Sequence, residues 1–183
     1  ANDLINVTIP PNITTIEEHT FVHNQLQNVI IPEGVRVIGN GAFGSNQLTS
    51  VTIPSSVVHI SSSAFIENQL TTLTIPNSVT FVGDWAFSKN QLTTLTIPDS
   101  VTSIGDYAFL ENQLTSLTIP NSVTNIGPFA FSDNNLTSLT IPENLQFIRG
   151  YTFQNNQIES IFFNGNRPEI YNDNEVVWMP LGD

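Results

Sequence analysis

Few side chains in this sequence could act as metal ligands or proton carriers, and its three histidines are the first to consider. His19 and His23 are four residues apart, the spacing at which two histidines can bind zinc from one face of a helix. The residues around them predict a corner between extended segments instead of a long helix, and His59 falls in a different part of the pattern. We therefore expect no shared histidine metal site.

Nucleophiles and carboxylates give no stronger indication of catalysis. The chain has no cysteine, which excludes thiol chemistry, disulfides and cysteine metal sites. Serine, histidine and aspartate are present, but not at the spacing of a nucleophile elbow or another catalytic signature. Acidic residues are scattered, although Asp84 and Asp106 align in the repeat described below, and they lack the glycine-aspartate period of calcium-binding β-rolls. The sequence predicts a protein that is not an enzyme and has no catalytic residue, metal or cofactor.

The charge balance excludes two classes of partner. Four basic residues stand against sixteen acidic ones, and the net charge is -12. So few cations cannot neutralise a row of phosphates, which argues against nucleic acid and anionic membranes as partners. No apolar run approaches the ~18 residues of a membrane span, so we expect no membrane insertion. The chain starts inside its repeating pattern without a basic and hydrophobic leader, which we interpret as a mature product or a piece of a longer protein.

An internal repeat organises the whole chain. Asparagine recurs every 22 residues without insertion or deletion, at positions 2, 24, 46, 68, 90, 112, 134 and 156. A fixed period of this length is typical of a solenoid, in which each coil buries its apolar face against the next. The sequence predicts one solenoid over residues 1–183, with units starting at 2, 24, 46, 68, 90, 112 and 134 and a terminal capping unit at 156–183.

Each unit has its own pattern of extended segments and turns. Alternation over residues 95–97 predicts a short strand with one buried face, which Pro98 ends because it cannot donate a ladder hydrogen bond. Residues 100–105 predict a second extended segment, and residues 106–109 a short 3-10 or helical turn. In the unit that starts at Asn90, the side chains predicted to point inward are Leu92, Leu95, Ile97, Val101, Ile104 and Phe109.

The pattern LxxLxIPxSVTxIGxxAFxxN resembles the leucine-rich repeat of bacterial surface proteins called BspA-like or Treponema-type. The resemblance covers residues 2 to about 155, although units in that class are commonly one residue longer and often carry cysteine where this chain has asparagine. It implies a right-handed leucine-rich-repeat coil, mainly β, with a parallel β-sheet on the concave face. It also implies adhesion or protein binding at the bacterial cell surface, without catalytic residues. Trp178 and Met179 are expected to cover the open end of the core.

The recurring asparagine is best explained as structure. Asparagine at a corner can hydrogen-bond the backbone of its own coil and of the neighbouring coil, so we expect an amide ladder. The glutamine column beside it is expected at the surface.

Two rows of hydroxyl side chains are the first candidate binding surface. They occupy outward positions of the predicted strands, on what we expect to be the concave face, and the strands would lie about 4.8 Å apart. Three interpretations stay open: strand propensity with solubility, a surface for a protein partner, and an ice-binding array like the Thr-x-Thr surfaces of some solenoids. The candidate residues are Thr52, Thr74, Thr96, Thr118 and Thr140 in one row, and Ser50, Thr72, Thr94, Ser116 and Ser138 in the other.

A second candidate surface is an aromatic column in the C-terminal half, formed by Trp85, Tyr107, Phe129 and Tyr151. Rings at one repeat position can stack from coil to coil, or a partly exposed stripe of rings can bind a protein or a glycan. Phe81 and Phe147 share another variable repeat position and add to the second interpretation.

These features favour a non-enzymatic adhesion or binding module at the bacterial cell surface, secreted and linked to other domains. Its expected partner is a host or cell-surface protein or glycan. The alternative is a structural spacer within a larger surface protein, and an ice-binding threonine array is a minor alternative.

Overall fold

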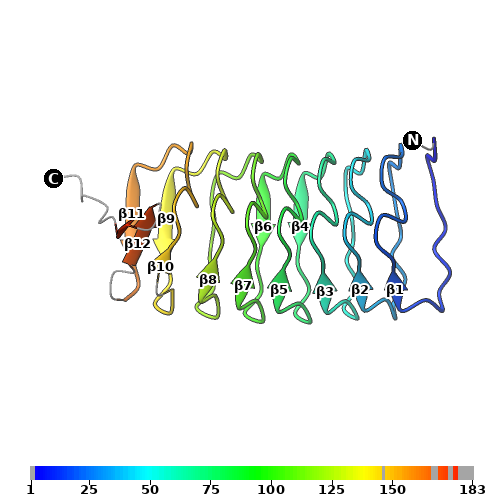
Figure 1. Cartoon of the computed structure of the whole chain (residues 1–183), viewed down its shortest axis with the longest axis horizontal. Helices are drawn as coiled ribbons and strands as arrows, with labels where there is room; N and C mark the ends of the chain where they lie inside the picture. Colours follow the sequence, from blue (N-terminus) through cyan, green and yellow to red (C-terminus); the bar gives the residue numbers. More distant parts are fainter. Residues whose placement is uncertain (1–2, 146, 166–168, 173–174, 177–183) are drawn as a thin grey trace.

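The computed structural model describes residues 3–145, 147–165, 169–172 and 175–176, and there the chain forms a parallel β-solenoid of about seven turns without a helix. Figure 1 shows the coils side by side along one axis, with the N-terminal coils at one end and the C-terminal coils at the other. The predicted fold class is therefore confirmed. The expected end cover by Trp178 and Met179 lies outside the described residues.

One parallel sheet runs through most of the solenoid. Its strand order is β1-β2-β3-β5-β7-β8, and paired residues are 22 positions apart, as in Thr15 with Val37 and Ile104 with Ile126. The constant period thus sets the register, because every coil contributes residues at the same two repeat positions. The strands are β1 (Thr15–Ile16), β2 (Val37–Ile38), β3 (His59–Ile60), β5 (Phe81–Val82), β7 (Ser103–Ile104) and β8 (Asn125–Ile126).

A second set of strands lies at the other extended segment of the coil. β4 (Thr72–Thr74) pairs in parallel with β6 (Thr94–Thr96), and β9 (Ser138–Ile141) pairs in parallel with β11 (Ser160–Phe163). Single bridges join Ile30 to Thr52 and Thr118 to Thr140. Near the C-terminus, β10 (Phe147–Ile148) pairs in parallel with β12 (Glu169–Asn172), which pairs antiparallel with β13 (Glu175–Val176).

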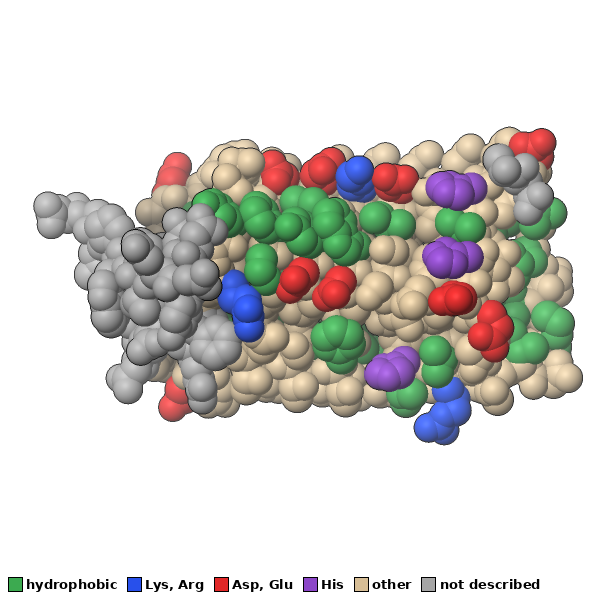
Figure 2. All heavy atoms as spheres, viewed as in Figure 1, with side chains coloured by type: hydrophobic (Ala, Val, Ile, Leu, Met, Phe, Trp, Pro, Cys, Tyr) green, Lys and Arg blue, Asp and Glu red, His purple; other side chains and the backbone are tan. Residues whose placement is uncertain are grey.

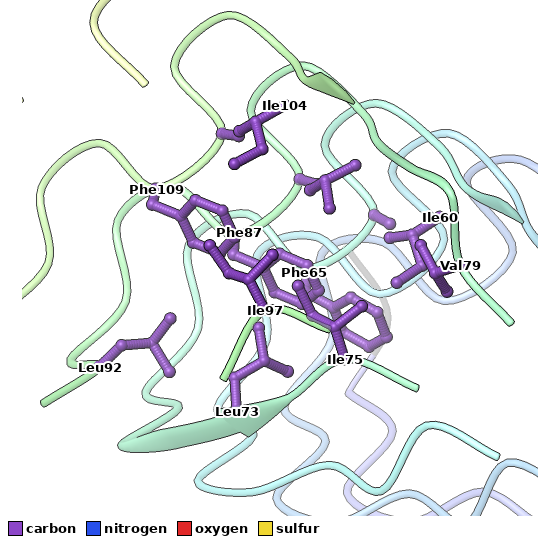
Figure 3. Packing of buried hydrophobic residues seen from close by; sticks show 14 of the residues in the cluster. Ile60, Phe65, Leu73, Ile75, Val79, Phe87, Leu92, Ile97, Ile104 and Phe109 are labelled. Carbon is purple, nitrogen blue, oxygen red and sulfur yellow. The ribbon is translucent and has the colours of Figure 1, made fainter. Parts of the chain in front are cut away.

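The core is a set of identical side chains stacked from coil to coil. Phenylalanines from residue 21 to residue 153 form one column whose neighbouring ring centroids lie 5.3–5.7 Å apart. Figure 3 shows Phe65, Phe87 and Phe109 in a row among aliphatic side chains. Of the six residues predicted to point inward in the unit at Asn90, five are buried and Leu95 is half-buried. Because no coil can bury its core side chains alone, the stacking of neighbouring coils stabilises the array.

The predicted asparagine ladder is confirmed by its hydrogen bonds. Asn90 Oδ1 accepts the Leu70 N–H at 3.0 Å and its Nδ2 donates to the Phe65 carbonyl at 3.0 Å, both about one turn of the solenoid back along the chain. The same amide donates to the carbonyls of Phe87 and Ser88, which lie just before Asn90 in the chain. Equivalent bonds recur at Asn46, Asn68, Asn112 and Asn134. These side chains join neighbouring coils through groups that the corner would otherwise leave unpaired.

The segment predicted as a short 3-10 or helical turn is instead a hydrogen-bonded turn. Leu110 N–H donates to the Tyr107 carbonyl at 3.1 Å, but Tyr107 has φ of 58°, which a right-handed helix cannot include. The same left-handed conformation recurs one coil earlier at Trp85, with φ of 59°. The sequence carries one signal for this conformation, since Gly41, with φ of 57°, occupies the same repeat position.

Candidate functional site

The ten hydroxyl residues predicted for binding form what we call the strand face, the outward side of the second set of strands. Nine of them are exposed and Thr140 is half-buried. Thr72 pairs with Thr94, and Thr74 pairs with Thr96, so the two rows run in register across neighbouring coils. Within the described residues, none of the ten hydroxyls takes part in a side-chain hydrogen bond, although the neighbouring Thr71 carbonyl accepts one from Thr93 Oγ1. The strand-face hydroxyls are therefore free to bind an external group.

Apolar residues continue the row that runs from Thr52 to Thr140 at both of its ends. Ile30 is 83% exposed and bridges to Thr52, while Phe162 is 58% exposed and pairs with Thr140. Among the described strands, the complete Thr-x-Thr pattern occurs only in β4 and β6. The strand face is thus a mixed surface of hydroxyl and apolar groups, which suits an irregular partner better than a repeating lattice.

The predicted aromatic column is a stack of rings that remains partly open to solvent. Trp85 and Tyr107 have centroids 4.0 Å apart, and the Tyr107–Phe129 and Phe129–Tyr151 centroids are each 5.0 Å apart, with interplanar angles of 4–16°. Tyr151 is 40% exposed, and the other three rings are half-buried. We call these four residues the aromatic stripe. The rings pack on one another, as expected, and still present their edges at the surface.

Backbone hydrogen bonds hold the stripe in place. Trp85 N–H donates to the Asp106 carbonyl at 2.8 Å, and Tyr107 N–H donates to the Pro128 carbonyl at 2.9 Å. These bonds join adjacent coils where the chain takes the left-handed conformation, which costs a non-glycine residue about 1–2 kcal/mol. Ring stacking of about 0.5–1.5 kcal/mol per pair beyond burial offsets part of that cost.

Carboxylates lie along both sides of the aromatic stripe, an arrangement that the sequence analysis missed. Asp84 and Asp106 directly precede Trp85 and Tyr107, while Glu67, Glu111 and Asp133 occupy the repeat position four residues after the stripe position. Figure 2 shows the hydrophobic band with acidic side chains on either side of it. We call these five residues the acidic rows. The sequence signal for the acidic rows is that their residues align at two repeat positions. This alignment is hard to see in the linear sequence, where the same residues are scattered.

The acidic row before the stripe contains two unlike carboxylates. Asp84 Oδ1 accepts the Asp106 N–H at 2.9 Å. The corresponding donor for Asp106 would be residue 128, which is proline and has no N–H. Burial and repulsion from Asp84 raise the pKa of the Asp106 carboxyl, against an opposing effect of Arg149.

The other acidic row is better neutralised at one end than at the other. Glu67 accepts a hydrogen bond from Ser45 Oγ at 2.9 Å and lies 3.2 Å from the Lys89 ammonium, and these contacts lower the pKa of Glu67. Asp133 accepts from Ser132 Oγ and Asn155 Nδ2. Glu111 is exposed and has no side-chain hydrogen bond within the described part of the chain.

His19 and His23 lie at a corner between extended segments, as the sequence indicated. His19 and His23 both have φ of 55° and are exposed, while His59 begins the short strand β3. Among the described residues, no group of three or more His, Cys, Asp or Glu is placed to hold a metal ion. The described residues also include no helix that is long and apolar enough to cross a membrane.

The repeat, the parallel register and the buried ladders together define a leucine-rich-repeat solenoid. The BspA-type leucine-rich repeat region matches this chain in six copies, over residues 1–93 and 59–174. The chain belongs to this family, as the resemblance of its repeat implied.

Solved structures share the fold. A leucine-rich repeat protein from Bacteroides ovatus superposes with a TM-score of 0.62 at 22% identity, over 86% of this chain and 48% of that protein. A leucine-rich cell surface protein from Faecalibacterium prausnitzii gives a TM-score of 0.60 at 26% identity, over 88% of this chain and 58% of its own. This chain therefore spans about half the length of these two structures. Curated proteins include no match to the chain.

Proposed function

We propose that this chain is a non-enzymatic binding module displayed at the bacterial cell surface, where its strand face recognises a protein or glycan partner. The observation that carries the proposal is the pair of in-register rows of exposed hydroxyls without partners in the described chain. Hydroxyls can both donate and accept hydrogen bonds, so repeated rows of them offer many weak contacts to one partner.

The family and one solved structure support the location. The chain belongs to the BspA-type repeats, and the Faecalibacterium protein that it resembles is described as a cell surface protein. A net charge of -12 keeps such a module soluble and disfavours nucleic acid. Since the chain spans only part of the solved structures, we place it beside other domains of a longer surface protein.

The test is capture of purified host extracellular proteins and glycans on the immobilised chain. We expect Thr74→Lys, Thr96→Lys and Thr118→Lys together to abolish capture, because three long cations would cover the strand face. The melting temperature should change little, since substitutions at exposed sites usually alter stability by less than about 0.5 kcal/mol.

A matched control places the same charges elsewhere. Thr80, Thr102 and Thr124 are exposed threonines in successive coils at a different repeat position. Changing these three to lysine should preserve capture. Equal loss in both variants would attribute the effect to charge alone, and absence of any capture by the unmodified chain would favour the spacer role.

A further inference from the structure

The aromatic stripe and the acidic rows form a second surface whose chemistry is more specific than that of the strand face. We propose that this surface binds an extended cationic segment, rich in lysine or arginine, of a partner protein. The inference goes beyond the proposed function, because it concerns different residues and names the chemistry of the partner.

The charge distribution is the first argument. Five carboxylates lie along the aromatic stripe, and within the two acidic rows the Lys89 ammonium is the one cation. That ammonium is already paired with Glu67. Glu111 and Asp106 have no cationic side chain in a salt bridge within the described residues. Arg149 is close enough to act on the Asp106 carboxyl, yet carboxylates outnumber cations on both sides of the apolar band. This excess of negative charge favours a ligand with positive charges on both sides of its own axis.

The ring geometry is the second argument. The four rings are stacked nearly parallel, so their faces are covered by one another and mainly their edges are exposed. A sugar ring stacks on an exposed aromatic face, and a row of ring edges offers little such area. The aliphatic stem of lysine or arginine packs well on edges of this kind, while its charged end reaches past the band to a carboxylate.

Trp85, at the end of the stripe, has a stacked ring on one side only. Its ring stacks on Tyr107, and the residue at the same position in the preceding coil is Ser63, which has no ring. Gly41 occupies that position one coil further back. No ring covers this side of Trp85 within the described residues. An indole face without a stacking partner is the best site for a cation–π contact, particularly with arginine.

The dimensions fit a short segment of extended chain. Four coils at the ~4.8 Å spacing of neighbouring strands give a stripe roughly 14 Å long. An extended peptide rises about 3.3 Å per residue, so four or five residues cover the stripe. Successive side chains of such a peptide point to opposite sides, toward one acidic row and then the other.

The experiment measures binding of a dye-labelled peptide of about ten residues, in which lysine and arginine alternate without spacers so that basic side chains point to both sides, by fluorescence anisotropy. A peptide with glutamate in place of the basic residues is the negative control. We expect saturable binding of the cationic peptide alone, weakened at least tenfold when the salt is raised from about 0.05 to 0.5 M, because screening shortens the range of exposed charges.

Two variants test the two parts of the surface. The pair Asp106→Asn and Glu111→Gln removes one carboxylate from each acidic row, and Trp85→Ser with Tyr107→Ser removes two rings. Serine is compatible with the backbone there, since Ser63 has φ of 56° at the same repeat position. Each double variant should weaken peptide binding at least tenfold, and circular dichroism checks that it remains folded.

A matched control variant distinguishes binding at this surface from general electrostatic attraction to an acidic protein. Asp99→Asn with Glu143→Gln makes the same change in charge at exposed residues of another repeat position and should leave binding within about twofold. Equal loss in this control, or equal binding of the glutamate peptide, would overturn the proposal. Binding of neutral oligosaccharides instead, lost in the serine variant, would assign the stripe to glycans.

The strand face is tested separately from this surface. Thr74→Ala, Thr96→Ala and Thr118→Ala should leave peptide binding unchanged, whether or not that face captures a partner. Loss of peptide binding in this uncharged variant would contradict the assignment to the aromatic stripe. Failure of capture at the strand face with intact peptide binding would reject the proposed function and leave this inference standing.

Discussion

Replacing one ladder asparagine should destabilise the solenoid measurably, and Asn90 is the clearest position. Its side chain is 7% exposed and makes four hydrogen bonds to backbone groups of two coils. Asn90→Ala would leave the Leu70 N–H buried without an acceptor. An unpaired buried donor costs about 1–3 kcal/mol.

The carbonyl groups that accept hydrogen bonds from Asn90 should contribute less to the loss of stability, because each keeps a hydrogen bond from a second donor. The Phe65 carbonyl also accepts from Asn68, the Phe87 carbonyl from Asn112, and the Ser88 carbonyl from the Glu67 N–H. We therefore expect a loss of about 2–3 kcal/mol in the free energy of unfolding, dominated by the Leu70 donor. At about 2–4 °C per kcal/mol for a chain of this size, the melting temperature should fall by roughly 4–12 °C.

The assay is urea and thermal unfolding followed by circular dichroism, with amide hydrogen exchange at Leu70 as a local measure. Gln91→Ala, at the exposed neighbouring residue, is the control and should change stability by less than about 0.5 kcal/mol. If Asn90→Ala and Gln91→Ala unfold alike, and exchange at Leu70 is not faster, the amide ladder does not hold the coils together.

Three further predictions concern other contacts. Gly105→Ala should lower stability by about 1–3 kcal/mol in urea unfolding, because a Cβ there would lie 2.6 Å from the Asp84 backbone nitrogen; Ser61→Ala, at the same repeat position, should not. Asp106→Asn should stabilise the fold at neutral pH. The raised pKa of Asp106 means that the folded state holds its proton more tightly, so the wild-type chain should lose stability relative to the variant as pH rises above about 3.9, the usual aspartate pKa; parallel stability profiles would contradict this. Lys89→Ala should cost less than about 1 kcal/mol in thermal unfolding, since its pair with Glu67 is 43% and 47% exposed.

Much of the fold followed from the period of 22 residues. The asparagine column, the inward apolar positions and the stacked core each repeat in sequence, and a residue at one repeat position meets its equivalent in the next coil. Leu95 was predicted buried but is half-buried. The helical turn was predicted wrongly because the left-handed residues Trp85 and Tyr107 are poorly suited to that conformation by type. Tertiary hydrogen bonds between coils impose it on them.

The candidate surfaces, like the fold, were predicted only in part from the sequence. The sequence placed the hydroxyl rows on outward strand positions and put the four rings of the aromatic stripe in one column, because both sets recur at fixed repeat positions. It did not show that Glu67, Glu111 and Asp133 lie beside those rings, since they come from a different repeat position across a turn.

By itself, the sequence determined that the chain stacks identical coils, which residues fill their core and that few cations are available. Only the tertiary structure decided how far each ring is exposed, which carboxylates flank it and which hydroxyls lack partners. Periodicity fixes what lies above and below a residue along the solenoid. The path of the chain within one coil fixes what lies beside it, and that path depends on turn conformations held by hydrogen bonds between coils.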